Sequence, residues 1–343
     1  MIKVFGRNPT GKRLETVRKS KQYKDGAFQN IESTEVMGGE FSYTDLLWKT
    51  IRRPAYVTPG KPVPNVKTDL HKPLDSKPTI TWFGHSSYLL QSNGFNTLVD
   101  PVFSGYASPF SFFARAFPGS DIYKVQDMPP IDLLLITHDH YDHLDYNAIL
   151  GLKGNVKRIV TSLGVGEHLE YWGFDTSMIT ELDWWQGTEI TNDIRITATP
   201  ARHFSGRTIT RAQTLWSSFV LEINGYRIFL GGDSGYGEHF KAIARQTRNF
   251  DLAILESGQY GAGWPLIHMR PEETVRAAQD LGAKILLPVH WAKFALSIHP
   301  WNEPPKRVTA EAASLGQPVA FPMIGEPYVI GQGVNNARWW DFE

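Results

Sequence analysis

The chain has no cysteine, no excess of either charge and no long apolar run. Without cysteine there is no disulfide bond, thiol nucleophile or cysteine-bound zinc, so any metal must be held by histidine and carboxylate side chains. The 35 basic and 35 acidic residues cancel, and we therefore expect no nucleic-acid partner. No apolar run approaches the roughly 20 residues of a membrane-spanning helix, and the first residues lack a signal-peptide core. These absences predict a soluble, cytoplasmic protein whose membrane association, if any, is peripheral.

The first 77 residues differ in character from the rest. Eight basic residues up to residue 30 outnumber two acidic ones, giving a net charge of +6: Lys3, Arg7, Lys12, Arg13, Arg18, Lys19, Lys21 and Lys24 against Glu15 and Asp25. Such a run is typical of a solvated, extended arm, or of a segment attracted to anionic lipid. Residues 42–53 predict a short helix that packs on the body or contacts lipid. We therefore expect a basic arm with this helix over 1–77, ending in a proline-rich connector, and a main domain over 78–343.

Apolar periodicity predicts both strands and helices in the main domain. Strands are expected over residues 79–83, 87–91, 96–99, 131–136, 156–161, 189–190, 194–199, 217–223, 226–230, 252–255 and 285–289. Helices are expected over residues 146–152, 163–172 and 271–281. The crossover between the strands at 131 and 156 predicts that these two strands are parallel, with helices on the outside of a sheet.

The densest group of polar side chains follows the apolar run at 131–136. His138, His140, Asp142 and His143 lie within six positions, where a buried strand passes into a loop. Imidazole and carboxylate groups bind borderline divalent metals, and this spacing lets the loop face two ions. Three further side chains also follow apolar strands: His203, Asp233 and His290. Side chains so far apart in sequence suit a site at the edge of two packed sheets.

Five motifs together resemble those of a known family. They are Trp82-Phe-Gly-His-Ser-Ser87, Leu98-Val-Asp-Pro-Val-Phe-Ser104, Thr137-His-Asp-His-Tyr-Asp-His-Leu-Asp145, Gly232-Asp-Ser-Gly-Tyr236 and Val289-His-Trp291. The His-x-His-x-Asp-His spacing resembles that of the metallo-β-lactamase superfamily. The whole set is similar to the branch containing N-acyl-phosphatidylethanolamine-hydrolysing phospholipase D. This resemblance covers about residues 78–330 and implies a mixed α/β (α+β) domain, the four-layer αββα sandwich of that superfamily.

The resemblance also implies a set of metal ligands. His138, His140 and His203 would hold one ion, Asp142, His143 and His290 the other, and Asp233 would bridge them. Two divalent ions are expected, with zinc the first choice and manganese or iron as alternatives. The ions would share a water as the attacking hydroxide, so Asp142 and Asp233 count as catalytic as well as metal-binding.

Three more residues are assigned to the surroundings of the metals. The resemblance places Asp100 behind the histidines, where a carboxylate fixes the orientation of a ligand ring. His85 is assigned to the same outer position, with a core histidine as the equal alternative. His268 precedes the helix that begins at Pro271 and is interpreted as an acid or a phosphate contact.

The substrate contacts follow from charge and aromatic content. Arg202 adjoins His203 and could bind a phosphate or form a surface ion pair, and Tyr260 lies in a glycine-rich segment after a strand. Phe103 and Phe110 belong to an aromatic stretch at 103–117 that either packs on the core or lines an apolar groove. Pairs of tryptophans at 184–185 and 339–340 fit packing or contacts in a homo-oligomer.

Three functions are compatible with these features. The first is a binuclear phosphodiesterase of phospholipase D type that acts on N-acyl-phosphatidylethanolamine-like lipids. The second is a lactonase or ester hydrolase with a small soluble phosphorylated substrate, bound in a basic pocket at Arg202, Arg207 and His268. The third is a membrane- or nucleic-acid-interacting protein with a structural metal site. Fold and metal ligands alone do not separate the first two functions.

Overall fold

Two β-sheets face each other in the computed structural model, which describes residues 3–38, 54–72, 77–333 and 337–342. The seven-stranded sheet has the order β15 (Pro327–Val329), β3 (Thr79–Trp82), β4 (Tyr88–Ser92), β5 (Phe95–Val99), β6 (Ile131–Ile136), β7 (Val156–Ser162) and β8 (Ile179–Leu182). The six-stranded sheet has the order β14 (Leu286–Val289), β13 (Leu252–Glu256), β12 (Tyr226–Leu230), β11 (Ser218–Ile223), β10 (Ile194–Thr199) and β9 (Gly187–Thr191).

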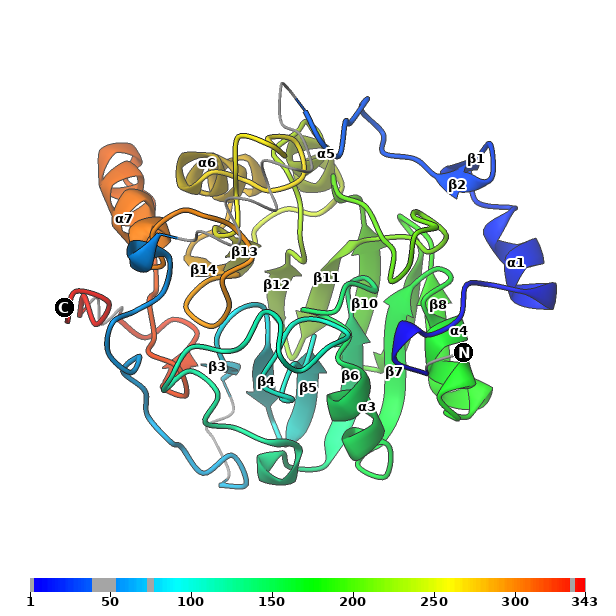
Figure 1. The fold of residues 1–343 in the computed structure, drawn as a ribbon, viewed down its shortest axis with the longest axis horizontal. Coiled ribbons are helices and arrows are strands. Elements are labelled where there is room, and N and C mark those ends of the chain that lie inside the picture. Colours follow the sequence, from blue (N-terminus) through cyan, green and yellow to red (C-terminus); the bar gives the residue numbers. More distant parts are fainter. Residues whose placement is uncertain (1–2, 39–53, 73–76, 334–336, 343) are drawn as a thin grey trace.

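Helices cover the outer faces of both sheets (Figure 1). The seven-stranded sheet carries α3 (Tyr146–Leu152) and α4 (Gly166–Tyr171), and the six-stranded sheet carries α5 (His239–Gln246), α6 (Pro271–Leu281) and α7 (Glu303–Leu315). Short 3-10 helices occur at Lys3–Phe5 (η1), Ala55–Val57 (η2), Val125–Asp127 (η3) and Thr176–Met178 (η4). This arrangement confirms the predicted α/β class and the four-layer αββα sandwich.

Alternating side chains of the strands fill two cores. On β6, Leu133 and Leu135 point into the core between the sheets, whereas Leu134 and Ile136 point into the core beneath α3 and α4. All four side chains are fully buried, and burying one such side chain contributes about 1.5–3 kcal/mol. Because both faces of β6 are covered, its sequence is continuously apolar rather than alternating.

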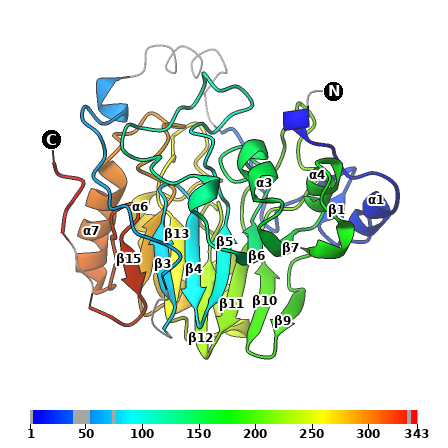
Figure 2. The same ribbon diagram turned by 90° about the horizontal axis from the view of Figure 1, so that it is seen from below.

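The functional loops leave the sheets at one edge. β5, β6, β7 and β8 are parallel neighbours, and so are β12, β13 and β14, so the carboxyl ends of each set lie together. This edge is uppermost in Figure 2, where the loops after β5 and β6 lie beside α3. Parallel strand ends are a common place for ligands, because loops from several strands converge there.

Most predicted elements are confirmed within one or two residues, including the parallel pairing of β6 and β7. The sequence pattern does not predict β8, β15, α5 or α7. α6 begins as predicted at Pro271: the Glu273 side chain accepts from the Arg270 backbone N–H, and Gly282 ends the helix with a left-handed φ of 68°. The helix predicted within 42–53 lies wholly outside the described part of the chain.

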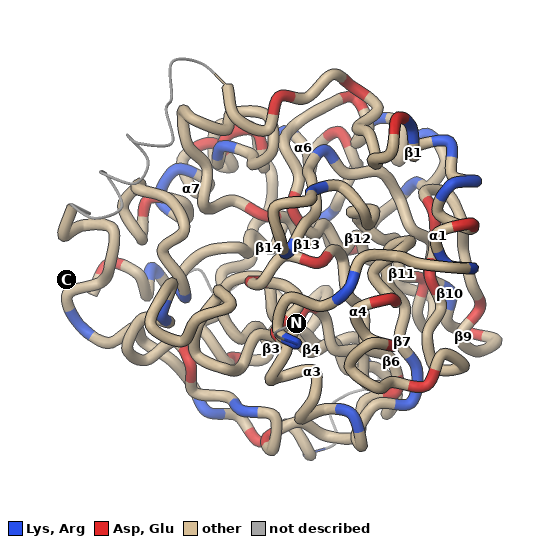
Figure 3. Tube along the Cα trace, turned by 45° about the vertical axis from the view of Figure 1, so that its right-hand side comes forward, with Lys and Arg blue, Asp and Glu red and all other residues tan. Residues whose placement is uncertain are grey.

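The predicted extended arm is wrong for residues 3–38, here called the N-terminal strap. It contains α1 (Gly11–Val17) and a hairpin of β1 (Tyr23–Lys24) and β2 (Ala27–Phe28), and it lies against the body. Arg13 forms ion pairs of 2.6–2.9 Å with Glu167, Glu170 and Glu181. Part of the basic run is thus paired with carboxylates distant in sequence, and blue and red segments lie beside one another near α1 (Figure 3). Among the described residues, no helix is long and apolar enough to cross a membrane.

Candidate metal centre

Three histidines and one aspartate gather at the ends of β6, β10 and β12. His138 and His140 follow β6, His203 follows β10 and Asp233 follows β12. His138 Nε2 lies 2.9 Å from His140 Nδ1, which lies 3.1 Å from His203 Nε2. One ligand atom from each of the four side chains lies within 4.8 Å of the others. This group has the donors and the spacing needed to hold one divalent ion.

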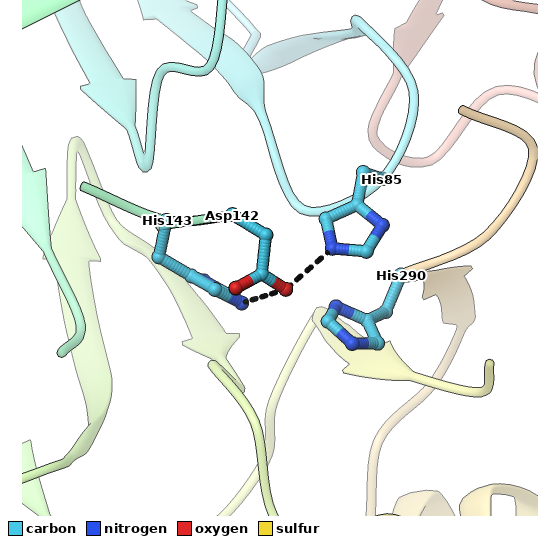
Figure 4. A group of neighbouring side chains, drawn as sticks. All are labelled: His85, Asp142, His143 and His290. Atoms are coloured by element: carbon cyan, nitrogen blue, oxygen red, sulfur yellow. Dashed lines mark hydrogen bonds and ion pairs between the residues drawn. The ribbon is translucent and has the colours of Figure 1, made fainter. Parts of the chain in front are cut away.

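A second group, meeting the same 4.8 Å spacing, consists of His85, Asp142, His143 and His290 (Figure 4). Asp142 Oδ2 lies 2.9 Å from His85 Nε2 and 3.6 Å from His143 Nε2. His85 enters the group because its backbone pairs with the segment after β14: its N–H donates to Trp291 O and its C=O accepts from His290 N. The structure therefore places the ring of His85 beside the predicted ligands of the second ion.

Asp233 stands between the two groups. Its Oδ2 faces His138 Nε2 at 3.9 Å and His203 Nε2 at 3.7 Å. Its Oδ1 lies 3.1 Å from both His143 Nε2 and His290 Nδ1. Each carboxylate oxygen thus faces a different group, which is the orientation that a bridging ligand requires.

Unpaired buried nitrogens show that these residues fit metal ions. His143 Nε2, which faces Asp142 and Asp233, and His290 Nε2 are buried and have no hydrogen-bond partner, a costly state unless another ligand satisfies them. Burial lowers the pKa of His138, His203 and His290 well below the usual value, so their rings are neutral and keep a lone pair for a metal. Neutral imidazoles with buried carboxylates form a donor set suited to zinc and similar ions.

Asp100 fixes one of these rings from behind. Its Oδ2 lies 2.8 Å from His143 Nδ1, and the carboxylate accepts the N–H and hydroxyl of Thr137 at 2.8 and 2.6 Å. The backbone here is strained, because Asp100, His85 and His290 have φ values of 42°, 53° and 69°. Such conformations persist only when surrounding contacts hold them, and they cluster at functional sites.

Comparison with known proteins agrees with this geometry. A family model described as "Beta-lactamase superfamily domain" matches residues 96–291, more than half of the chain. The chain belongs to the β-lactamase superfamily. The matched span carries all seven predicted metal ligands.

Superfamily relatives include an uncharacterized protein of Mycobacterium tuberculosis, 36% identical over 94% of this chain and 87% of the relative. N-acyl-phosphatidylethanolamine-hydrolyzing phospholipase D 1 of Caenorhabditis elegans is 28% identical over 78% of this chain and 81% of the relative. The structure of Igni18, a metallo hydrolase from Ignicoccus hospitalis, aligns with a TM-score of 0.56 and 18% identity, covering 75% of this chain and all of that one. The structural likeness confirms the fold, and the nematode relative supports the resemblance to the phospholipase D branch.

In this superfamily chain, a buried pair adjoins the metal groups and joins the predicted residue His268 to Glu256, which the sequence pattern did not single out. Glu256, the last residue of β13, accepts from Met269 N–H at 2.9 Å, and its Oε2 lies 3.3 Å from His268 Nδ1. Burial opposes protonation of His268, but the carboxylates of Glu256 and Asp233 outweigh it and raise the pKa of the ring. His268 also joins Asp233 and His290 within 4.8 Å. Like the predicted ligands, Glu256 stands at the end of an apolar strand, and that signal could have found it.

A pocket of about 250 Å³ opens over the centre. Polar side chains of both metal groups form part of it, together with His268, Gln259 and Arg211. The apolar part consists of Val36, Met37, Phe204, Trp264, Ile267 and Leu296. The pocket is therefore mixed in character, with charge beside the metal groups and an apolar surface around them.

None of the four residues assigned to the substrate lines this pocket. Arg202 donates instead to the strap, at Ser33 O and Thr34 Oγ1. Phe103 is buried in the core beneath α3 and α4, and Phe110 is half exposed on the surface. Tyr260 is buried, and its hydroxyl donates to Glu303, the first residue of α7. The basic pocket expected at Arg202, Arg207 and His268 is also not formed, because only His268 of these lines the pocket.

Arg207 supports the loop at residues 139–144, here called the metal-binding loop, from the side away from the pocket. Its buried guanidinium donates to the carbonyls of Asp139 and Leu144 at 2.8 Å, and to the carbonyl of Val4 in the strap. Asp139 also accepts from Gly206 N–H, and its Oδ2 lies 3.1 Å from His168 Nε2. Because residues 139–144 include three predicted ligands, these contacts fix the loop that carries them.

The buried His239 supports the segment after Asp233. We expect it to make the free energy of unfolding depend on pH. His239 Nε2 lies 3.1 Å from Ser234 Oγ, and burial, with a smaller effect of Arg202, lowers its pKa to about 3. An unfolded histidine has a pKa of about 6.5, so between these values only the unfolded chain binds the proton. Its contribution to stability is therefore full above about pH 6.5 and is lost as the pH falls toward 3.

We expect His239→Gln to reduce this loss, because glutamine does not titrate. Between about pH 7 and pH 4.5, the wild-type chain should lose roughly 2–3 kcal/mol more unfolding free energy than the variant. Urea unfolding at the two pH values measures the difference. Equal losses in both proteins would show that His239 is not held neutral.

Proposed function

We propose that this chain is a binuclear metal-dependent hydrolase that cleaves a phosphodiester in the manner of a phospholipase D. The observation that carries the proposal is the position of Asp233, whose two carboxylate oxygens face two separate groups of imidazoles and carboxylates. His138, His140 and His203 would hold one ion, and Asp142, His143 and His290 the other. His85 is proposed to orient Asp142, and Asp100 to orient His143.

Two bound divalent ions, with zinc as the first choice and manganese or iron as alternatives, supply Lewis acidity at the phosphate and make water a nucleophile near neutral pH. In the proposed reaction, water oxygen bonds to phosphorus and the bond from phosphorus to the leaving alcohol oxygen breaks. The leaving oxygen needs a proton, and His268 is the proposed donor. The Nδ1 atom of His268 faces Glu256, which orients the ring. We therefore propose that the other ring nitrogen, Nε2, is available to a substrate in the pocket.

Two observations favour a lipid such as N-acyl-phosphatidylethanolamine. The C. elegans relative and a Saccharomyces cerevisiae relative are both named as hydrolases of that lipid. The loop after β5 exposes Phe110, Phe112 and Phe113 by 49%, 70% and 52%, with the first two rings stacked. This loop leaves the sandwich at the same edge as the metal groups (Figure 2). Exposed aromatic rings can insert into a membrane interface, so we also propose peripheral membrane contact.

A second candidate is the hydrolysis of a lactone or ester in a small soluble phosphorylated substrate. The pocket volume favours it, because about 250 Å³ is below the roughly 300–1,000 Å³ typical of pockets for drug-sized ligands. A lipid substrate would place only its phosphate and neighbouring groups in this volume, with the remaining chains outside.

The decisive assay uses zinc-loaded protein and N-acyl-phosphatidylethanolamine vesicles in isotopically labelled water. We expect phosphatidic acid that carries the label, with unlabelled N-acylethanolamine, because attack at phosphorus transfers water oxygen to the phosphate. Mass spectrometry of both products measures this. Turnover of a soluble phosphorylated lactone without turnover of the vesicles would favour the second candidate, and label in the alcohol product would contradict attack at phosphorus.

A further inference from the structure

The N-terminal strap reaches the metal centre. Asn30 Nδ2 donates to His203 O at 2.7 Å, and His203 N–H donates back to Asn30 Oδ1 at 3.1 Å. Asn30 Oδ1 also accepts from the indole N–H of Trp216. The strap is therefore attached to the backbone of a predicted metal ligand through one side chain that both donates and accepts.

Further contacts hold the strap as it continues along the pocket. The Arg202 guanidinium donates to Ser33 O and Thr34 Oγ1 at 3.0 and 2.9 Å. Gly38 N–H donates to Gly263 O at 3.0 Å, on the segment that also carries Trp264. Residues 30–38 are thus tied at both ends to loops that line the pocket, which keeps the residues between them in place.

Between these attachments the strap supplies two apolar side chains to the pocket. Val36 and Met37 line it together with Trp264, Ile267 and Leu296, and with the ligands His140 and Asp142. Val36 and Met37 lie outside the span 96–291 that matches the superfamily. The metal groups and this part of the apolar wall therefore come from different parts of the chain.

We propose that Val36 and Met37 determine substrate specificity by receiving the alkyl portion that adjoins the group held at the metals. The inference rests on the proposed function for the identity of that group, a phosphoryl group. Each methylene group that is buried against an apolar surface makes the free energy of binding more favourable. A methionine side chain can also adapt its shape to a flexible alkyl chain. The polar side of the pocket then selects the reacting phosphate, and the strap selects how much alkyl chain may accompany it.

The test measures binding rather than turnover, with the zinc-loaded full chain and simple alkylphosphonates from methyl to butyl. In the wild-type protein we expect the Kd to fall about fourfold for each added methylene. Met37→Ala should weaken butylphosphonate about tenfold while changing methylphosphonate less than about twofold, because only the longer chain reaches the side chain. Met37→Trp, which fills the pocket, should make the affinity stop rising at a shorter chain.

The matched control is Ile31→Ala, an apolar residue of the same strap that is 60% exposed and outside the pocket. This variant should reproduce the wild-type series. Equal Kd values for methyl- and butylphosphonate in the wild-type protein, no binding of any phosphonate, or the same series for Met37→Ala and Ile31→Ala would each overturn the inference. A different outcome would separate this inference from the proposed function. If binding depended on chain length and Met37→Ala weakened it, but no phosphodiester were hydrolysed, the role of Val36 and Met37 in specificity would stand and the proposed reaction would be wrong.

Discussion

Asp233→Ala is expected to lower kcat/KM for the proposed substrate by about 10³-fold, because in the proposed reaction several kcal/mol of transition-state stabilisation would depend on two correctly placed ions. Asp233 faces both metal groups, so in the proposed centre its loss would remove a ligand from each ion. Metal analysis of the purified variant should show less than the two ions per chain expected for the wild-type protein. Initial rates and metal content measured on the same preparation check both effects.

The matched control is Asp193→Ala, which removes an exposed carboxylate from the turn between β9 and β10. It should leave both activity and metal content at wild-type levels. If Asp233→Ala retained full activity, the centre described here would not be the site of hydrolysis.

Arg207→Ala is expected to lower the free energy of unfolding by about 3–5 kcal/mol, the range found when one partner of a buried polar network is removed. Its guanidinium serves three carbonyl groups from the metal-binding loop and the strap, and it lies 4.1 Å above the ring of Tyr141. Truncation leaves those carbonyls without donors and opens a cavity. Urea unfolding measures the stability, and the metal content should fall with it because the loop is no longer braced.

Arg245→Ala, on the exposed side of α5, is the control for loss of an arginine and should change stability by less than about 0.5 kcal/mol. A loss as large in this control as in Arg207→Ala would mean that the described network does not carry the effect. Arg207→Lys is a further comparison, because lysine keeps the charge but cannot serve three acceptors with a planar fork.

The sequence predicted the parts of the site that follow apolar strands. His203, Asp233 and His290 each stand just after a strand. Strand patterns depend on neighbouring residues, so they can be recognised in the sequence without knowledge of the fold. Parallel pairing of β12, β13 and β14 brings Asp233 and His290 to one edge. β10 reaches the same edge with His203 through two successive antiparallel pairings, with β11 and of β11 with β12. Glu256 has the same position at the end of β13, so the same pattern also marks this residue.

The parts that the sequence did not predict depend on contacts between distant segments. The basic run at 1–30 predicts a solvated arm, because its partners, such as Glu167 and Glu181, stand more than 150 positions away in sequence. The position of Arg202 beside a predicted ligand indicates a substrate contact, whereas its partners in the structure, Ser33 and Thr34, lie in the strap. Charge and neighbours in sequence reveal that a side chain needs a partner, but not which partner the fold provides.

The strap also has a consequence for how the protein reaches its folded state. The strap is synthesised before every segment that it contacts. The carbonyl of Val4, for example, accepts a hydrogen bond from Arg207, which follows 203 positions later in the chain. Contacts of such long sequence separation close late and slow folding, because the chain loses loop entropy before it gains the contact. The sandwich can assemble from neighbouring strands first, and the strap then docks across the finished edge. One wall of the pocket is therefore among the first parts of the chain to be made, yet it can dock only after the loops that it contacts have formed.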